Sequence, residues 1–288
     1  MLNCGFFILI TLISIYPFYY VIINTISANN LSAGGQIIFL PRQIHFHNYS
    51  DVIKLPGLSH AAIVSVLRTI IGCAATVAAS AFLGYLFSQE KMWFRKAMYR
   101  LIIITMYFNA GMIAWYITMM NLHLTNNFWG YIFPAIVQPF NIILVKTYIE
   151  STPYSLQEAA KIDGANPMQV FIRIILPVIK PIMATIAVFA AVGQWNSFTD
   201  TLILMTDQKL YTLQFILYQF INQANSLAQT LRNTSASDSA LAASLATKAT
   251  PTSIRMTVTV IVVLPILFIY PYFQKYFVKG IMVGAIKG

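Results

Sequence analysis

Six long apolar segments constrain the fold of this chain more than any other feature of its sequence. They lie at about 5–26, 64–88, 98–120, 128–148, 179–204 and 256–278. A helix needs about 20 mostly apolar residues to cross a lipid bilayer, and each segment reaches that length. Only 9% of the residues are charged, whereas a soluble domain carries about 25%. The sequence therefore predicts an all-α, polytopic membrane protein with six transmembrane helices in a single domain over residues 1–288.

Lysine and arginine predict the side of the membrane on which each connection lies, because they concentrate in cytoplasmic loops. Eleven of the 18 lie in alternate connections or in the tail: Lys91, Arg95, Lys96, Arg100, Lys146, Lys161, Arg173, Lys180, Lys275, Lys279 and Lys287. The other seven are assigned to two long outer connections, which follow the rule weakly: Arg42, Lys54, Arg68, Lys209, Arg232, Lys248 and Arg255. Both termini and the loop at 150–178 are expected in the cytoplasm. The first segment lacks a basic leader and a small-residue cleavage site, so we expect a retained helix and not a signal peptide.

A polar, partly charged island at 158–177 separates the fourth apolar segment from the fifth. Just before it, Thr152 or Ser155 can cap a first short helix. Gly164 permits a tight bend or a close backbone approach, and Pro167 can begin a second helix. The second helix has apolar residues at three- and four-residue spacing, which predicts one apolar face: Met168, Phe171, Ile172 and Ile175. These residues alone predict an amphipathic helix–turn–helix, a form that suits docking in a groove of a partner.

This island resembles the EAA loop of the membrane subunits of bacterial ABC importers. The resemblance rests on Glu158-Ala159-Ala160, Gly164, Ile174 and Leu176-Pro177 at the expected spacing. In that family the loop is a short cytoplasmic coupling helix that docks into an ATPase subunit. The resemblance therefore implies ATPase-coupling roles for Glu158, Ala159, Ala160, Asp163, Gly164, Ile174, Leu176 and Pro177. It also implies a salt bridge from Glu158 to an ATPase arginine, where the sequence alone shows an available carboxylate.

Over nearly its whole length the chain resembles the MalG-type membrane subunits of carbohydrate-uptake ABC importers. The narrower match is to the LplC-like branch, which includes subunits of alginate-oligosaccharide importers, and it rests on residues 16–18, 194–196, 270–280 and 284–288. The implied partners are a second, MalF-like permease subunit, two MalK-like ATPase subunits, an extracytoplasmic solute-binding protein and membrane lipid.

Two segments are expected to contact these partners. The resemblance implies that residues 281–288 reach the ATPase subunits; a tail that only ends near them is the alternative. In the outer loop at 205–255, residues 211–222 are apolar enough for an interfacial helix, and 225–250 is polar and expected to be exposed and adaptable. The resemblance implies that this loop contacts the solute-binding protein; a loop without contacts is the alternative.

The resemblance implies a permease subunit of a binding-protein-dependent importer that carries an oligosaccharide or modified sugar across the inner membrane. ATP and Mg are expected in the partner ATPases, because this chain has no Gly-rich P-loop with Lys-Ser/Thr. We expect no catalytic site and no metal site, since His45 and His47 lack Cys or carboxylate partners at metal spacing. No basic patch with interleaved aromatic residues suggests nucleic acid. The alternatives are a secondary transporter, which usually shows internal repeats, and a structural or channel-forming membrane protein.

Polar residues within two apolar segments are candidates for the substrate path. Pro134 and Pro139 interrupt the fourth segment, and a kinked helix with amides beside it can line a cavity. The candidates are Gln138, Asn141, Gln194, Trp195, Asn196 and Asp200. The amides can instead bond across helices as packing contacts, and the kink can simply fit the packing. Asp200, the acid within a predicted span, can bind a sugar, gate the outer mouth or sit at the interface.

Overall fold

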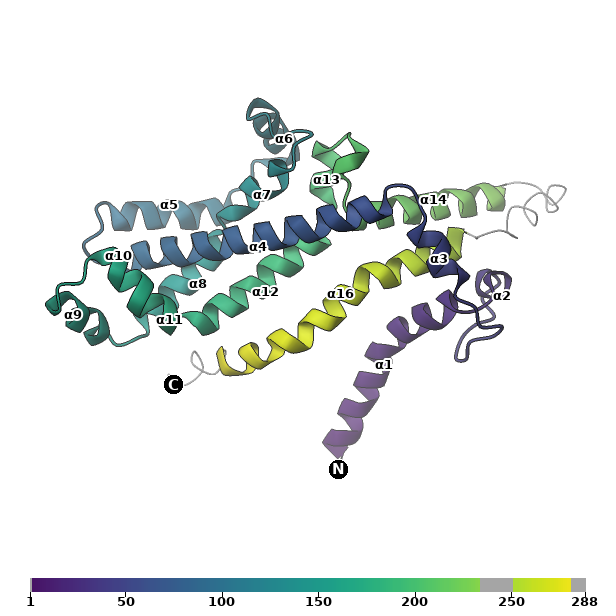
Figure 1. Cartoon of the computed structure of the whole chain (residues 1–288), viewed down its shortest axis with the longest axis horizontal. Helices are drawn as coiled ribbons and strands as arrows, with labels where there is room; N and C mark the ends of the chain where they lie inside the picture. The colour runs from purple at the N-terminus through teal and green to yellow at the C-terminus, as the bar shows by residue number, and fades with distance from the viewer. Residues whose placement is uncertain (1, 234–250, 281–288) are drawn as a thin grey trace. The chain divides into compact units, whose positions relative to one another are not determined.

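The computed structural model describes residues 2–233 and 251–280, and these residues form helices and connections without strands. The expected all-α class is therefore confirmed. The chain divides into two compact units, residues 1–62 with 211–267 and residues 63–210 with 268–288. Figure 1 labels the helices of both units. Residues 281–288 and 234–250, on which part of the expected partner contacts depend, lie outside the described residues.

The first unit is organised around the C-terminal end of α1 (Leu2–Thr25). It also contains α2 (Asn29–Ala33), α3 (His47–Ile53), α14 (Leu213–Asn233) and the first part of α16 (Pro251–Gly280). Asn24 accepts a hydrogen bond from the Ser32 hydroxyl at 2.7 Å, and Asn48 donates to the Thr25 carbonyl oxygen at 2.8 Å. Because the last carbonyls of a helix lack partners within the helix, these bonds hold the segment after α1 against its end.

Helix α14 differs from the expected outer loop. An interfacial helix was expected at 211–222 with an adaptable segment from 225, but α14 is one helix from Leu213 to Asn233. Residues 225–233 are therefore helical, and the adaptable character expected of this segment stays a prediction. Apolar residues recur at three- and four-residue spacing past Asn222, which favours one amphipathic helix: Ala224, Leu227, Ala228 and Leu231.

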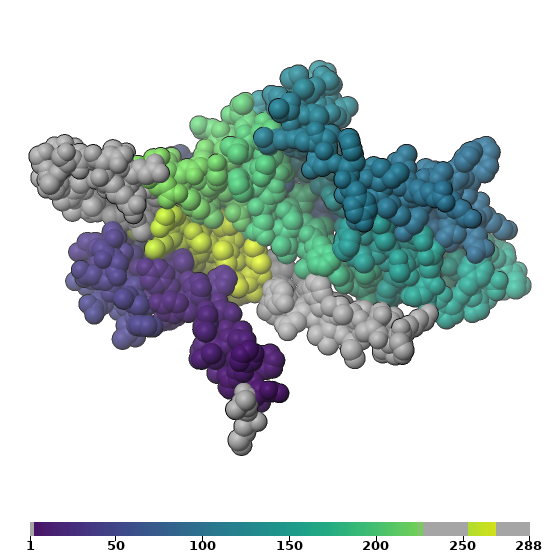
Figure 2. All heavy atoms as spheres, turned by 180° about the vertical axis from the view of Figure 1, so that it is seen from behind, coloured from purple at the N-terminus to yellow at the C-terminus, as the bar shows by residue number. Residues whose placement is uncertain are grey.

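The second unit is built on α4 (Leu58–Ser88), α8 (Pro139–Glu150) and α12 (Lys180–Asn196). It also contains α5 (Arg95–Tyr107), α6 (Gly111–Asn121), α7 (Trp129–Ile136), α13 (Thr199–Leu204) and a 3-10 turn, η2 (Gln208–Leu210). Helix α8 lies beside both α5 and α12, and these segments, blue to green in Figure 2, form one continuous body. A Cβ on Gly84 would lie 2.6 Å from the Val145 Cβ, so glycine is what lets α4 approach α8.

Three expected spans are each divided into two helices. The helix expected at 98–120 is α5 and α6, which meet at 119°. The cause is local: Gly111 has a φ of +85°, and the Asn109 side chain accepts the Gly111 N–H at 2.9 Å. The helix expected at 128–148 is α7 and α8, bent by 43° just before Pro139. The helix expected at 179–204 ends at Asn196, and α13 begins at Thr199.

Within the described residues, α4 and residues Asn3–Thr25 of α1 are each long and apolar enough to cross a membrane alone. Counting each bent pair as one span gives up to five. Residues Ser253–Phe268 of α16 form a shorter apolar helix. The presence of membrane-spanning helices is confirmed, and the number of six stays a prediction.

Candidate functional site

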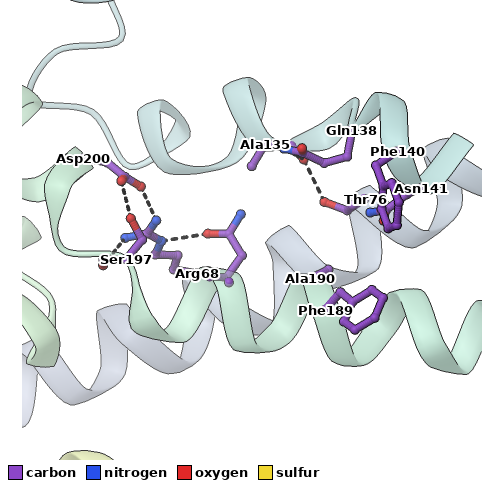
Figure 3. Close-up of a pocket in the computed structure, with 12 residues that line it drawn as sticks. Arg68, Thr76, Ala135, Gln138, Phe140, Asn141, Phe189, Ala190, Ser197 and Asp200 are labelled. Atoms are coloured by element: carbon purple, nitrogen blue, oxygen red, sulfur yellow. Dashed lines mark hydrogen bonds and ion pairs between the residues drawn. The ribbon is translucent and has the colours of Figure 1, made fainter. Parts of the chain in front are cut away.

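A cavity of about 590 Å³ lies within the second unit, between α4, α7, α8 and α12. Ligand pockets usually have volumes of about 300–1,000 Å³. Four of the six expected path residues line this cavity, as Figure 3 shows for most of them: Gln138, Asn141, Gln194 and Asp200. Trp195 is buried and Asn196 is exposed, and neither lines the cavity. The structure thus brings together polar residues from two apolar segments that are far apart in the sequence.

Arg68 on α4 is the centre of the polar groups at one end of this cavity. Its side chain is 2% exposed. Its Nε donates to Gln194 Oε1 at 2.8 Å, its Nη1 donates to the Ser197 carbonyl oxygen at 3.1 Å, and its Nη2 donates to the Asp200 carboxylate. Its Cζ lies 4.4 Å from the centre of the Tyr131 ring. A planar guanidinium can satisfy several acceptors at once, so this one side chain joins α4 to α7, α12 and α13.

The assignment of Arg68 to an outer loop is wrong. It lies in α4 among apolar residues, and its burial requires the acceptors that α12 and α13 provide. A lone arginine inside an apolar helix is expensive and usually functional, and this was the available signal. For Asp200, the structure adds a partner: one carboxylate oxygen accepts from Arg68, and the other accepts from the Ser197 hydroxyl.

Small residues on α4 make room for this arrangement. A Cβ on Gly72 would lie 2.6 Å from Nε2 of Gln194, so a side chain there would displace the amide. One turn further, the Thr76 hydroxyl donates to the Ala135 carbonyl oxygen of α7 at 3.0 Å. Arg68, Gly72 and Thr76, followed by buried Ser80 and Gly84, recur at four-residue spacing and form one stripe on α4. Residues four apart lie on the same side of a helix.

The island at 158–177 forms a bent helical segment. Helix α9 (Ser155–Ile162) is followed by α10 (Pro167–Gln169), a π-helix η1 (Val170–Ile175) and α11 (Leu176–Val178). Gly164, between the first two, has a φ of +81°, and no atom lies within 4 Å of a Cβ built there. Within this chain, glycine is therefore needed for the bend and not for a close approach.

The caps of these helices differ from the expectation. Neither Thr152 nor Ser155 caps α9; the Thr152 hydroxyl instead donates to the Ile149 carbonyl oxygen at 2.6 Å. The second helix is capped by Asn166, whose Oδ1 accepts from the Gln169 N–H at 2.9 Å, while Gln169 Oε1 accepts from the Asn166 N–H at 2.9 Å. This reciprocal pair is a capping box, and Asn-Pro-Met-Gln was its signal in the sequence.

The expected apolar face of the second helix is only half correct. Phe171 and Ile175 are buried, but Met168 and Ile172 are 52% and 54% exposed. The reason is the π-helix, whose hydrogen bonds run from residue i to i+5 and change which residues share a face.

The coupling segment, residues 155–178, is attached to α4 and α8. The Tyr85 hydroxyl donates to the Pro167 carbonyl oxygen at 3.0 Å, and the Tyr85 and Phe171 rings stack with centres 5.1 Å apart. Gln89 Nε2 donates to Gln157 Oε1 at 3.1 Å. The second helix is thus held by Tyr85 of α4, and α9 is held by Gln89, the residue that follows α4.

The expected coupling residues divide between an inner and an outer face. Ala160 is buried in the chain's own core, and Ile174 and Leu176 pack against that core. The remaining members are exposed: Glu158, Ala159, Asp163, Gly164 and Pro177. Ile162 beside them is 85% exposed. The exposed group offers a small, partly acidic surface, whereas the buried group holds that surface on the unit.

Comparison with known proteins identifies the family. Residues 76–283 match the family described as "Binding-protein-dependent transport system inner membrane component". The chain belongs to this family. Its members are membrane components of transport systems, so this chain is a transport component of the inner membrane. Such a system includes further subunits and a solute-binding protein.

Named relatives extend this family match over the whole chain. Protein LplC of Bacillus subtilis (strain 168) is 33% identical over 278 residues, which cover 96% of this chain and 90% of LplC. The polygalacturonan/rhamnogalacturonan transport system permease protein YtcP of the same strain is 29% identical, covering 100% of this chain and 98% of YtcP. A crystal structure of a bacterial ABC transporter involved in the import of the acidic polysaccharide alginate contains a chain with 27% identity and a TM-score of 0.83, covering 96% of this chain and 95% of that chain. The expected importer-permease fold is confirmed.

We predict unequal losses of stability when either partner of the Arg68–Asp200 pair is removed. Asp200→Asn leaves a guanidinium that is 2% exposed without a counter-charge and should lower the free energy of unfolding by about 3–5 kcal/mol. Arg68→Gln leaves a carboxylate that is 23% exposed and that water can reach, so the loss should be smaller, about 1–3 kcal/mol.

A double-mutant cycle measures this pair in the purified transporter. In reversible unfolding in mixed micelles, the double variant should be more stable than the sum of the single losses implies, by about 0.5–3 kcal/mol. Lys54→Gln, an exposed basic residue of the first unit, is the matched control and should change little. Additive losses would mean that the two charges do not interact.

The cavity makes a separate prediction about water access. In a background lacking Cys4 and Cys73, Gln138→Cys should react with a membrane-impermeant thiol reagent, because Gln138 is exposed and lines the cavity. Trp195→Cys should react at least about tenfold more slowly, because a buried thiol is shielded from the reagent. Equal rates at the two positions would show that the cavity is not the water-accessible surface.

Proposed function

We propose that the chain is the permease subunit of an importer for oligosaccharides or modified sugars, including alginate-type oligosaccharides. ATP is hydrolysed by partner ATPase subunits, and a solute-binding protein delivers the sugar. The names of the relatives support this substrate class: YtcP is named for polygalacturonan and rhamnogalacturonan, and the matching crystal structure for alginate. In this proposal, ATP and Mg bind to the partner ATPase subunits and not to this chain.

One structural observation carries the proposal: the coupling segment and the cavity wall are joined by α12. The coupling segment ends at Val178, and α12 begins at Lys180 after a 78° bend. The same helix then contributes Phe189 and Gln194 to the cavity. A force applied to the exposed face of α9 would therefore reach the cavity through covalently continuous and tightly packed elements.

The chemistry of the cavity suits a sugar with many hydroxyl groups. Gln138, Asn141 and Thr76 provide amide and hydroxyl groups, while Phe140 and Phe189 provide apolar surface. Arg68, the basic residue of the lining, is paired with Asp200. This wall therefore offers hydrogen-bonding groups and little net charge, which fits a path that accepts sugars selected elsewhere.

The proposal also covers how the subunits of the complex are arranged and which side of the membrane each part of this chain occupies. A second, MalF-like permease subunit would complete the path, and two MalK-like ATPases would bind the coupling segments of the two permeases. Both termini would be cytoplasmic, and the loop at 205–255 would meet the solute-binding protein. A secondary transporter and a structural or channel-forming membrane protein remain the alternatives, and neither would need an ATPase dock.

Transport by the reconstituted complex tests the proposed function. Vesicles containing the complete importer should take up uronate oligosaccharides only when ATP and the solute-binding protein are both present. A panel of neutral and acidic oligosaccharides identifies the substrate. Uptake driven by an ion gradient without ATP would support a secondary transporter, and passive flux would support a channel.

We predict that Glu158→Lys and Gly164→Val uncouple ATP hydrolysis from transport. Glu158 is exposed on α9, so the first change reverses a charge on the proposed docking face. Gly164 has a φ of +81°, a conformation that costs a non-glycine residue about 1–2 kcal/mol. Both variants should reach the membrane but lose most of the ATPase stimulation by liganded binding protein, by about tenfold or more, the size of a lost docking hot spot.

The control for this prediction is Asp51→Lys, which reverses an exposed charge on α3 in the first unit. It should retain normal stimulation. Normal transport and stimulation in both Glu158→Lys and Gly164→Val would refute the coupling role of this segment.

A further inference from the structure

Three basic side chains near the start of α5 are exposed: Lys91, Lys96 and Arg100. None of the three forms a hydrogen bond or an ion pair with another residue of the described ranges 2–233 and 251–280. Lys96 and Arg100 are four residues apart on α5 and so share one side of it. The nearby acid of the loop is Glu90, which is also exposed. The group therefore keeps an excess of positive charge.

The neighbouring Arg95 differs from these three cations because it has partners within the chain. Arg95 donates to the Phe87 carbonyl oxygen at 2.7 Å and to the Glu150 carboxylate at 2.6 Å. Lys146 donates to the other oxygen of that carboxylate at 2.6 Å. Arg95 therefore holds the loop to α8, and Glu150 is already occupied by two cations.

Two aromatic side chains stand beside these cations. Trp93 is 84% exposed and Phe94 is 66% exposed, with ring centres 4.9 Å apart. Tryptophan concentrates at the boundary between hydrocarbon and headgroups, where its ring is buried and its N–H is solvated. An adjacent pair of such rings is costly to leave in water and indicates that the loop touches the bilayer.

The exposed surface of α5 continues from the cations into apolar side chains. Met98, Leu101 and Ile104 are 48%, 63% and 64% exposed, at three-residue spacing along the helix. Because α5 belongs to a chain that spans the membrane, this apolar row fits the hydrocarbon. The cations at its start then lie at the depth of the lipid phosphates.

We propose that Lys91, Lys96 and Arg100, together with Trp93 and Phe94, form a binding site for the headgroup of an anionic phospholipid. The positive charge attracts the phosphate, the two rings lie among the headgroups, and the acyl chains follow the apolar row of α5. Charge complementarity and continuity with this row favour lipid over an ATPase subunit, which lies outside the bilayer. Gln89 binds Gln157 of the coupling segment, and Arg95 binds Glu150 of α8. The bound lipid would therefore lie next to the coupling segment.

Trp93 provides a direct probe of this site in the assembled transporter. The complete complex is placed in nanodiscs that contain either brominated phosphatidylglycerol or brominated phosphatidylcholine, since bromine quenches nearby tryptophan. The chain contains four tryptophans, so the signal of Trp93 is taken as the difference between the wild type and Trp93→Phe. The proposal predicts stronger quenching of this difference by the anionic lipid. Equal quenching by the two lipids overturns it.

A triple variant tests the role of the cations. In this variant all three cations are replaced: Lys91→Gln/Lys96→Gln/Arg100→Gln. It is also measured with and without Trp93→Phe. It should lose the preference for phosphatidylglycerol, because the affinity should fall about fivefold for each cation removed. The matched control is Arg42→Gln/Lys54→Gln/Lys209→Gln, which removes the same charge from exposed positions elsewhere and should keep the preference. An unchanged triple variant, or an equal loss in the control, contradicts the proposal.

Two further outcomes distinguish other occupants of the site. If inorganic phosphate at millimolar concentration abolishes the preference for phosphatidylglycerol, the site binds a free phosphate and not a lipid. If neither lipid quenches Trp93 until the ATPase subunits are removed, a protein partner covers the patch. Either result overturns the proposal, and no step of the experiment requires transport of a sugar.

Discussion

Arg68 lies at 2% exposure in an apolar helix, where a guanidinium is stable only if it is fully paired. Its partners come from helices α7, α12 and α13 and from the connection between the last two. Since lipid gives helices no hydrophobic reason to associate, such polar contacts and close packing determine how they meet. The position of α12 relative to α4, and with it the cavity wall, depends on this one cation.

The coupling segment depends on the same two helices. Tyr85 and Gln89 of α4 and its following loop bind the segment, and α12 continues from it after the bend at Ile179. The exposed face of α9 and the cavity are thus two ends of one packed structure. In the function proposed above, this continuity would let a partner subunit that binds the exposed face of α9 act on the cavity wall through packed and covalently linked elements.

The class of the fold and the place of the coupling segment could be predicted from the sequence, because both depend on local composition and spacing. For Gly164 the sequence left a tight bend and a close backbone approach open, and the structure shows the bend. The Arg68–Asp200 pair could not be found in this way, since its members are 132 positions apart and only the packing of α4 against α12 and α13 brings them together. The break between α5 and α6 was missed because glycine also occurs in transmembrane helices that do not bend, and the bond from the Gly111 N–H to the Asn109 side chain is seen only in the structure. The π-helix was missed because the expected apolar face assumed the three- and four-residue spacing of an α-helix, whereas the hydrogen bonds of a π-helix join residues five apart.

The stripe on α4 has a mechanical consequence. Within this stripe, Arg68 and Gly72 contact α12, Thr76 contacts α7 and Gly84 contacts α8, in each case through a small or polar group. These close contacts oppose rotation of α4 about its own axis. Rolling α4 about its long axis would carry a charged group toward hydrocarbon and push a bulky side chain into the space beside Val145. Rearrangement of this unit therefore has to tilt α4 or move it together with its neighbours, and the helix keeps the same face toward the cavity throughout.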